Sequence, residues 1–385
     1  MTDITAVLRE HPVFDGHNDL PWALRDAFDQ VPDAHLQTGQ PALQTDVPRL
    51  RAGGVGAQFW SVYVPSSLPE PQAAVATFEQ IDVVHRVLEA HPEVFRWTPT
   101  AADVRAAIAA GLIASLPGAE GGHSIASSLG VLRALRRAGV AYLTLTHNDN
   151  TAWAASATGE PVDFGLTGFG REVVAEMNRI GMLVDLSHVH ERTMHDALDV
   201  STRPVIFSHS CCRAVTDHPR NVPDGVLERL RANGGVLMLA FVPGFVSQSC
   251  ADHRAAAAEE QLRLGLTGWP YLPEGDADAR TGFQSWLERH PRPAANIADV
   301  VAHVEHARDV VGPDHLGLGG DYDGTDELPR GLEDVAGYPR LLQALAERGW
   351  SATDLGALTS GNVLRVLEEA QDGTSQFRGD QDGTS

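Results

Sequence analysis

Histidines and carboxylates recur in this sequence in short motifs whose spacing could hold a metal ion. The clearest motif is DGHND, in which His17 and Asp19 lie two residues apart, so both side chains point to the same side of an extended strand. Histidine and carboxylate ligands without thiolates suit Zn²⁺, and also Mn²⁺, Co²⁺ or Fe²⁺. The pattern therefore indicates a metal-dependent site. Its other candidate members are Glu120, His147, His188, His209 and Asp321.

The number of candidate ligands favours two metal ions over one. Five ligands are more than a single catalytic zinc ion needs while it keeps a position open for water. His17 and Asp19 fit one ion, and His188 and His209 fit the other. Glu120 is the natural bridge, because each of its two carboxylate oxygens can bind one ion. Two ions about 3.5–4 Å apart would activate a shared water and polarise a carbonyl group, so we expect hydrolytic chemistry.

Two candidates remain for the other steps of such a hydrolysis. Asp321 can take a proton from the attacking water and later give it to the leaving amine. His147 is expected to hydrogen-bond the oxyanion that develops on the carbonyl group. A serine-based mechanism is not favoured, because the sequence lacks a G-x-S-x-G motif.

Several neighbouring residues leave alternatives open. His190, two positions after a proposed ligand, is either a competing ligand or the start of a helix. His123 follows the proposed bridge and either supports the ligands or has no part in the site, and Asp323 is an alternative lining residue of the pocket. Asp15 and Asp185 precede ligand histidines, and either orient them or pair with the backbone.

These side chains can meet only if the fold brings together distant parts of the chain, and the apolar pattern indicates how. Eight short apolar runs end in polar residues, and stretches with helical periodicity separate most of them. Alternating strands and helices predict an α/β protein, a (β/α)₈ TIM-like barrel, whose catalytic groups lie at the carboxyl ends of the strands. The predicted strands are 13–19, 55–64, 112–120, 141–148, 182–188, 205–210, 236–242 and 316–323, and the predicted helices include 73–90, 129–138, 168–180 and 298–311.

The barrel is predicted to form a single domain over residues 1–370. Residues 244–293, between the seventh and eighth strands, form a connection far longer than the usual few residues. We expect this insertion to be a lid over the substrate, with an interface arm as the alternative, and its length is compatible with a homodimer. Residues 371–385 repeat QDGTS and contain few apolar residues, which predicts a disordered C-terminal tail.

Composition excludes several functions. All 29 basic residues are arginine, so the chain has no lysine for a Schiff base, a P-loop or a carbamoylated metal bridge, which favours a carboxylate bridge. The formal charge of −22 argues against nucleic acid and anionic membranes as partners. Three cysteines do not suffice for a secreted disulfide framework, and the first residues show no secretory signal, so we expect a cytoplasmic protein.

Seven motifs together resemble those of the membrane (renal) dipeptidase family of the amidohydrolase superfamily. They are FDGHNDLPW, GAEGGHSI, LTLTHN, VDLSHV, FSHS, HPRNVPD and GGDYDG, and their order and spacing match the family from His11 to Ala370. The resemblance implies a (β/α)₈ hydrolase with two zinc ions that cleaves dipeptides, including those with a D-residue at the C-terminal position. It implies zinc ligation by His17, Asp19, Glu120, His188 and His209, with Glu120 as the bridge, acid/base catalysis by Asp321, a carbonyl contact from His147 and a substrate carboxylate contact from Arg220.

The sequence therefore predicts a zinc dipeptidase. A guanidinium group at Arg220 suits a carboxylate, because it can donate two parallel hydrogen bonds to it. One departure concerns the segment after the seventh strand, where related enzymes carry a tyrosine and this chain has Phe241. The alternatives are another two-metal hydrolase acting on N-acyl-amino acids or lactones, and a metal-containing peptide-binding barrel without activity.

Overall fold

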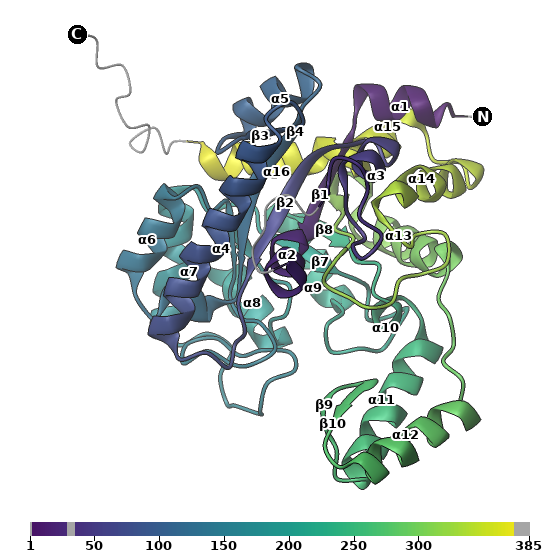
Figure 1. Ribbon diagram of the computed structural model, residues 1–385. Coiled ribbons are helices and arrows are strands. Elements are labelled where there is room, and N and C mark those ends of the chain that lie inside the picture. Colours follow the sequence, from purple (N-terminus) through teal and green to yellow (C-terminus); the bar gives the residue numbers. More distant parts are fainter. Residues whose placement is uncertain (1, 29–34, 373–385) are drawn as a thin grey trace.

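Eight parallel strands close into a barrel in the computed structural model, which describes residues 2–28 and 35–372 (Figure 1). The strand order is β2-β1-β11-β8-β7-β6-β5-β4, and pairing of β2 with β4 closes the ring. The predicted (β/α)₈ barrel is confirmed, and each of the eight predicted strands is present. Their bounds are β1 Val13–Asn18, β2 Val55–Tyr63, β4 Ile113–Glu120, β5 Tyr142–Thr144, β6 Leu183–Asp185, β7 Ile206–Ser210, β8 Val236–Leu239 and β11 Leu316–Leu318.

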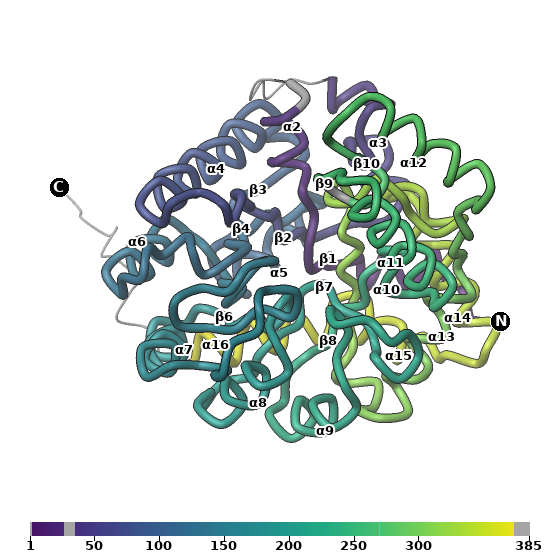
Figure 2. The backbone as a smooth tube through the Cα atoms, turned by 90° about the horizontal axis from the view of Figure 1, so that it is seen from below, coloured from purple at the N-terminus to yellow at the C-terminus, as the bar shows by residue number. Residues whose placement is uncertain are grey.

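Helices surround the strands, as the view from below the barrel shows (Figure 2). Each helix has buried apolar residues on one side, and polar side chains cap the first turn of several of them. In α7, for example, Thr167 accepts a hydrogen bond from Gly170 N, and Gly181 ends the helix in the left-handed conformation. The helices of this layer are α4 Glu70–Ala90, α5 Ala101–Ala109, α6 Leu129–Arg137, α7 Gly168–Ile180, α8 Glu191–Val200, α9 Asp224–Asn233, α13 Ile297–Val311 and α16 Asn362–Gln371. Further helices are α1 Ile4–Glu10, α2 Leu20–Phe28, α3 Val47–Ala52, α14 Tyr338–Glu347 and α15 Ala352–Gly356.

Two glycines allow β1 and β11 to approach β7 closely. A Cβ atom on Gly16 of β1 would lie 2.5 Å from the carbonyl oxygen of Ser208 in β7. A Cβ on Gly319, directly after β11, would lie 1.9 Å from the same oxygen. Contacts this short exclude a side chain, so glycine at both positions lets β1 and β11 pack against the middle of β7.

The structure contains elements that the apolar pattern did not predict. β3 (Phe95–Trp97) pairs with β4 outside the barrel ring, with Phe95 opposite Ile113. It has only three residues, and one of them is exposed, so it lacks the run of apolar residues that identified the others. The predicted tail from residue 371 lies outside the described residues from 373 onward, and Gln371 itself belongs to α16.

Residues 244–293 are largely folded, and they project from one side of the barrel (Figure 1). Their small core consists of Ala257, Leu266 and Phe283, with Tyr271 and Trp286 packed against it. This core is separate from the two clusters that fill the barrel and the layer between strands and helices. The elements of the insertion are α10 Pro243–Val246, α11 Gln248–Arg263, the hairpin of β9 Thr267–Trp269 and β10 Leu272–Glu274, and α12 Ala277–Arg289.

Candidate metal centre

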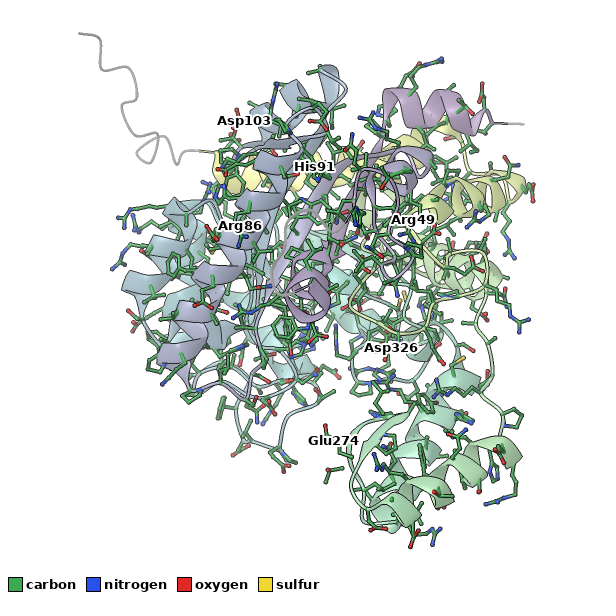
Figure 3. The ribbon with its side chains drawn as sticks, viewed as in Figure 1. Arg49, Arg86, His91, Asp103, Glu274 and Asp326 are labelled. Carbon is green, nitrogen blue, oxygen red and sulfur yellow. The ribbon has the colours of Figure 1, made fainter. Side chains whose placement is uncertain are left out.

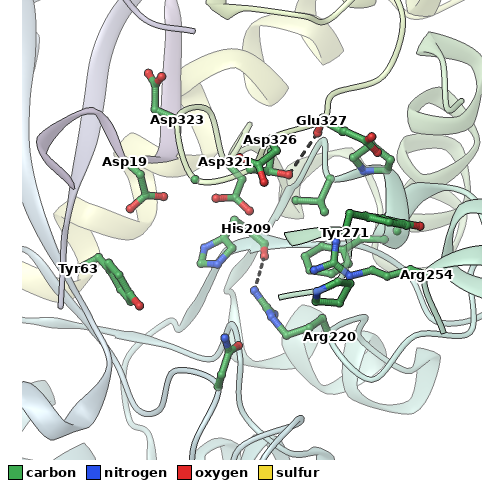
Figure 4. A pocket seen from close by; sticks show the side chains of 18 of the residues that line it. Asp19, Tyr63, His209, Arg220, Arg254, Tyr271, Asp321, Asp323, Asp326 and Glu327 are labelled. Carbon is green, nitrogen blue, oxygen red and sulfur yellow. Dashed lines mark hydrogen bonds between the residues drawn. The ribbon is translucent and has the colours of Figure 1, made fainter. Parts of the chain in front are cut away.

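A cavity of about 1130 Å³ opens where the barrel strands end, bounded on one side by the insertion (Figure 4). Predicted site residues that are far apart in the sequence line this one cavity, and His17 lies fully buried next to them. The fold therefore brings together the residues that the sequence singled out. Those lining the cavity are Asp19, Glu120, His147, His188, His209, Arg220 and Asp321.

Glu120 lies between two groups of potential ligands. Its Oε2 is 3.5 Å from His17 Nε2, which in turn lies 3.2 Å from Asp19 Oδ2. Its Oε1 is 3.0 Å from His188 Nε2 and 3.4 Å from His209 Nε2. Each oxygen of the carboxylate thus faces a different group, and the whole set is buried.

The hydrogen bonds of His209 leave one of its nitrogens free for a cation. Ser208 Oγ donates to Asp185 Oδ2 at 2.7 Å, so it accepts the proton of His209 Nδ1, which is 2.9 Å away. His209 Nε2 is then unprotonated, and it faces His188 Nε2 at 2.9 Å. A cation between these nitrogens would satisfy both, and the histidine and carboxylate donors suit zinc.

His17 is oriented in the same way. Tyr142 Oη lies 2.8 Å from His17 Nδ1 and 3.4 Å from the carbonyl oxygen of Gly16, so it can donate to that oxygen while it accepts the Nδ1 proton. His17 Nε2 then faces the cavity side, where it has no hydrogen-bond partner among the described residues. Asp15, by contrast, accepts from the backbone nitrogens of His17 and Gly320 at 3.1 and 3.0 Å. Of the two alternatives left open for Asp15, the structure shows the backbone pairing.

Asp321 lies beside the first group of potential ligands, His17 and Asp19. Burial, together with the negative charges of Asp19 and Glu120, raises the pKa of Asp321 well above its usual value. A carboxyl group with a raised pKa holds a proton more readily than an ordinary carboxylate, which suits a proton carrier. Asp323 differs from it, because its Oδ1 accepts a hydrogen bond from Gln44 N at 2.7 Å while the residue lines the cavity.

His147 faces the second oxygen of Glu120, with its Nε2 4.0 Å from Oε1. Burial lowers the pKa of His147 to about 4, so the imidazole is neutral at neutral pH and can donate a hydrogen bond. The ring of Tyr63, at the end of β2, lies 4.8 Å from that of His147. Tyr63 also lines the cavity, and we did not predict it because a single tyrosine at a strand end has no distinctive motif.

Arg220 is a buried cation that faces the cavity. Its guanidinium contacts Ser210 Oγ at 3.5 Å and the carbonyl oxygen of His209 at 3.4 Å, and it lies over the ring of Phe245. Among the described residues it makes no ion pair with a carboxylate, and burial lowers its pKa to about 10. An anion in the cavity would compensate this charge.

The remaining candidates have structural roles. His190 caps the start of α8 by accepting a hydrogen bond from Arg192 N, which is the helix alternative. His123 Nε2 lies 2.9 Å from the carbonyl oxygen of Val64, outside the groups that could hold an ion. Phe241, which follows β8, is buried against the ring of Tyr338.

A parallel barrel that gathers buried histidines and carboxylates at the carboxyl ends of its strands defines the class of barrel metallohydrolases. Within this class, the model of the membrane dipeptidase family (peptidase family M19) matches residues 1–380. The chain belongs to this family, as the sequence motifs predicted.

Named relatives agree with this assignment. The chain is 39% identical over 377 residues to dipeptidase 3 of Mus musculus, a match that covers 95% of this chain and 66% of that protein. It is 41% identical over 384 residues to an uncharacterized dipeptidase of Schizosaccharomyces pombe, covering 95% of this chain and 82% of that one. The chain thus spans somewhat less than two thirds of the mouse protein.

A solved structure shows the same fold with a ligand. A metallo peptidase from Rhodobacter sphaeroides, liganded with a phosphinate mimic of the dipeptide L-Ala-D-Ala, superposes with a TM-score of 0.76 at 26% identity. The match covers 94% of this chain and 99% of that one. Among the described residues of our chain, no helix has both the length and the apolar character needed to cross a membrane.

Proposed function

We propose that the protein is a dipeptidase that uses two zinc ions. The observation that carries this proposal is the position of Glu120, whose Oε2 faces buried His17 while its Oε1 faces buried His188 and His209. His17 and Asp19 would hold one ion, and His188 and His209 would hold the other. Membership of the dipeptidase family supports the choice of substrate. When bound, the ions would supply an activated water and polarise the carbonyl group of the substrate.

The chain's own residues position the dipeptide and move the proton. Arg220 binds the α-carboxylate of the C-terminal residue, which restricts substrates to short peptides because no chain can continue past it. His147, neutral at neutral pH, donates a hydrogen bond to the carbonyl oxygen as negative charge develops there. Asp321 takes the proton of the water and gives it to the leaving amine.

Dipeptides with a C-terminal D-residue are included in this proposal. The relative from Rhodobacter sphaeroides binds a mimic of L-Ala-D-Ala, which supports a cavity shape that accepts this stereochemistry. A screen of dipeptides with both C-terminal stereoisomers, together with N-acyl-amino acids and lactones, separates the proposed function from other two-metal hydrolases. Cleavage of the acyl substrates alone would contradict it.

The variant Asp321→Asn tests the assignment of the proton carrier. Asparagine keeps the shape of the side chain but cannot accept the proton, so we expect kcat to fall by about 10²–10⁴-fold. Metal analysis should still find two zinc ions per chain, since the ligands are unchanged. Asp82→Asn, on the exposed side of α4, is the matched control. Near wild-type turnover in Asp321→Asn would show that another group carries the proton.

A further inference from the structure

A second arginine lines the cavity, and the proposed mechanism gives it no role. Arg254, in α11 of the insertion, is half-buried, and burial lowers its pKa. Among the described residues it has neither a hydrogen bond nor an ion pair. Arg292, also of the insertion, differs because it pairs with Glu327 and lies over the ring of Tyr271.

Arg254 and Arg220 act on the same part of the cavity. Both line the cavity, as does His218, whose pKa is lowered by burial and then by the charges of Arg220, Arg254 and Arg213. Figure 4 draws Arg254 and Arg220 on the side of the cavity next to Tyr271, with Asp19 and Tyr63 across from them. This side of the cavity therefore carries two positive charges without a bonded carboxylate.

The packing of Arg254 explains why its side chain stays at the cavity. A Cβ atom added to Gly244 would lie 3.6 Å from Arg254 Cδ. The aliphatic part of the Arg254 side chain therefore packs on the segment that follows β8. The nearby acids do not neutralise it by contact. Glu327 is bound to Arg292, and Asp326, between the barrel and the insertion, is exposed and acts on Arg254 only through its longer-range field (Figure 3).

We propose that Arg254 binds the side-chain carboxylate of an acidic C-terminal residue, so that the enzyme prefers dipeptides ending in Asp or Glu. The inference rests on the proposed function, in which Arg220 takes the α-carboxylate. The side chain of that same residue is attached to the same Cα atom as the α-carboxylate. It would extend along the side of the cavity that carries the guanidinium group of Arg254. A half-buried guanidinium gains most from a partner of opposite charge, which an acidic side chain supplies and a neutral one does not.

The test compares substrates that differ only in charge. The kcat/KM values for Ala-Glu and Ala-Gln, each with an L- or D-residue at the C-terminus, are measured on the zinc-loaded wild type, Arg254→Gln and Arg263→Gln. Arg263 lies on the same helix, is exposed and pairs with Glu260, so it is the matched control. For the preferred stereoisomer, we expect a Glu over Gln ratio of at least about tenfold in the wild type and the control, and of about one in Arg254→Gln. The effect should appear mainly in KM, because the contact is to a part of the substrate that does not react.

The outcomes separate this inference from the proposed function. If no dipeptide is cleaved by the zinc-loaded wild type, the proposed function is wrong. If dipeptides are cleaved but the wild-type ratio is near one, or if Arg254→Gln keeps the wild-type ratio, only the role of Arg254 is overturned. The wild-type ratio needs no folded variant, and Arg254→Lys, which keeps the charge, should retain part of the preference.

Discussion

Ser208 determines how His209 can act, although it faces no substrate. Its hydroxyl donates a hydrogen bond to the carboxylate of Asp185 and therefore accepts one from His209 Nδ1. The imidazole proton is thus held on Nδ1, and Nε2 is left for a cation. The carboxyl group of Asp185 is itself fixed by Thr144 Oγ1 and by the backbone nitrogens of Ser187 and Ser208. A fully satisfied buried carboxylate of this kind is a rigid support for a ligand.

We predict that Ser208→Ala weakens zinc binding by about 10–100-fold, the usual effect of removing a partner behind a histidine ligand. The backbone bond from residue 208 to Asp185 remains, so the strand should keep its position. Competition with a chromophoric chelator measures the affinity. Ser115→Ala, a buried serine of β4 whose hydroxyl faces a backbone carbonyl, is the control. Equal zinc affinities in Ser208→Ala and the wild type would refute the role of the hydroxyl.

Among single residues, the sequence predicted those whose type is rare at the place where they occur. A histidine or carboxylate at the end of an apolar strand, repeated on several strands, is improbable unless the groups meet, which is why His17, Glu120 and His209 could be named. Ser208, Tyr63 and Arg254 could not, because a serine, tyrosine or arginine is common at such places. Their roles depend on what each side chain faces in three dimensions.

At the scale of elements, the two glycines that face Ser208 connect strand packing to the site. Gly16 and Gly319 let β1 and β11 approach β7 at Ser208, one residue before the proposed ligand His209, so strand packing and the position of this histidine are set together. The eight strands were predictable because each is a run of buried apolar residues. The folded insertion was not, because its helices are amphipathic around only a small core.

We predict that Gly319→Ala lowers the free energy of unfolding by about 1–3 kcal/mol or more, because its Cβ would overlap the carbonyl oxygen of Ser208. Urea unfolding measures the change. In Gly225→Ala of α9 the new Cβ meets no atom within 4 Å, so stability should stay within about 1 kcal/mol of the wild type or rise. Similar stabilities of the two variants would show that the close approach is not rigid.

At the scale of the whole molecule, the buried ionisable groups of the site destabilise the fold when no cation is bound. Three histidines and two carboxylates are buried together, and without cations their polar atoms are poorly compensated. Ligation in the folded chain alone would make the ions a part of its stability.

We predict that chelation lowers the melting temperature by about 5–10 °C, since an ion at 1,000 times its dissociation constant stabilises the fold by about 4 kcal/mol. Scanning calorimetry before and after treatment with a chelator measures this, and added Zn²⁺ should restore the original value where Mg²⁺ does not. His209→Ala, which lacks one proposed ligand, should respond less. An unchanged melting temperature on chelation would mean that the buried groups need no cations.

Because the insertion has a core of its own, it can change in sequence independently of the barrel. The proposed chemistry depends on strand ends that cannot shift without disturbing the barrel, whereas Arg254 lies on α11, which contributes Ala257 to the separate core. If Arg254 binds the substrate as proposed, mutations in residues 248–289 would change which side chains are accepted while the strand ends stay as they are. Substrate specificity could then change in evolution through this one segment, and the same segment would be the place to engineer a new specificity.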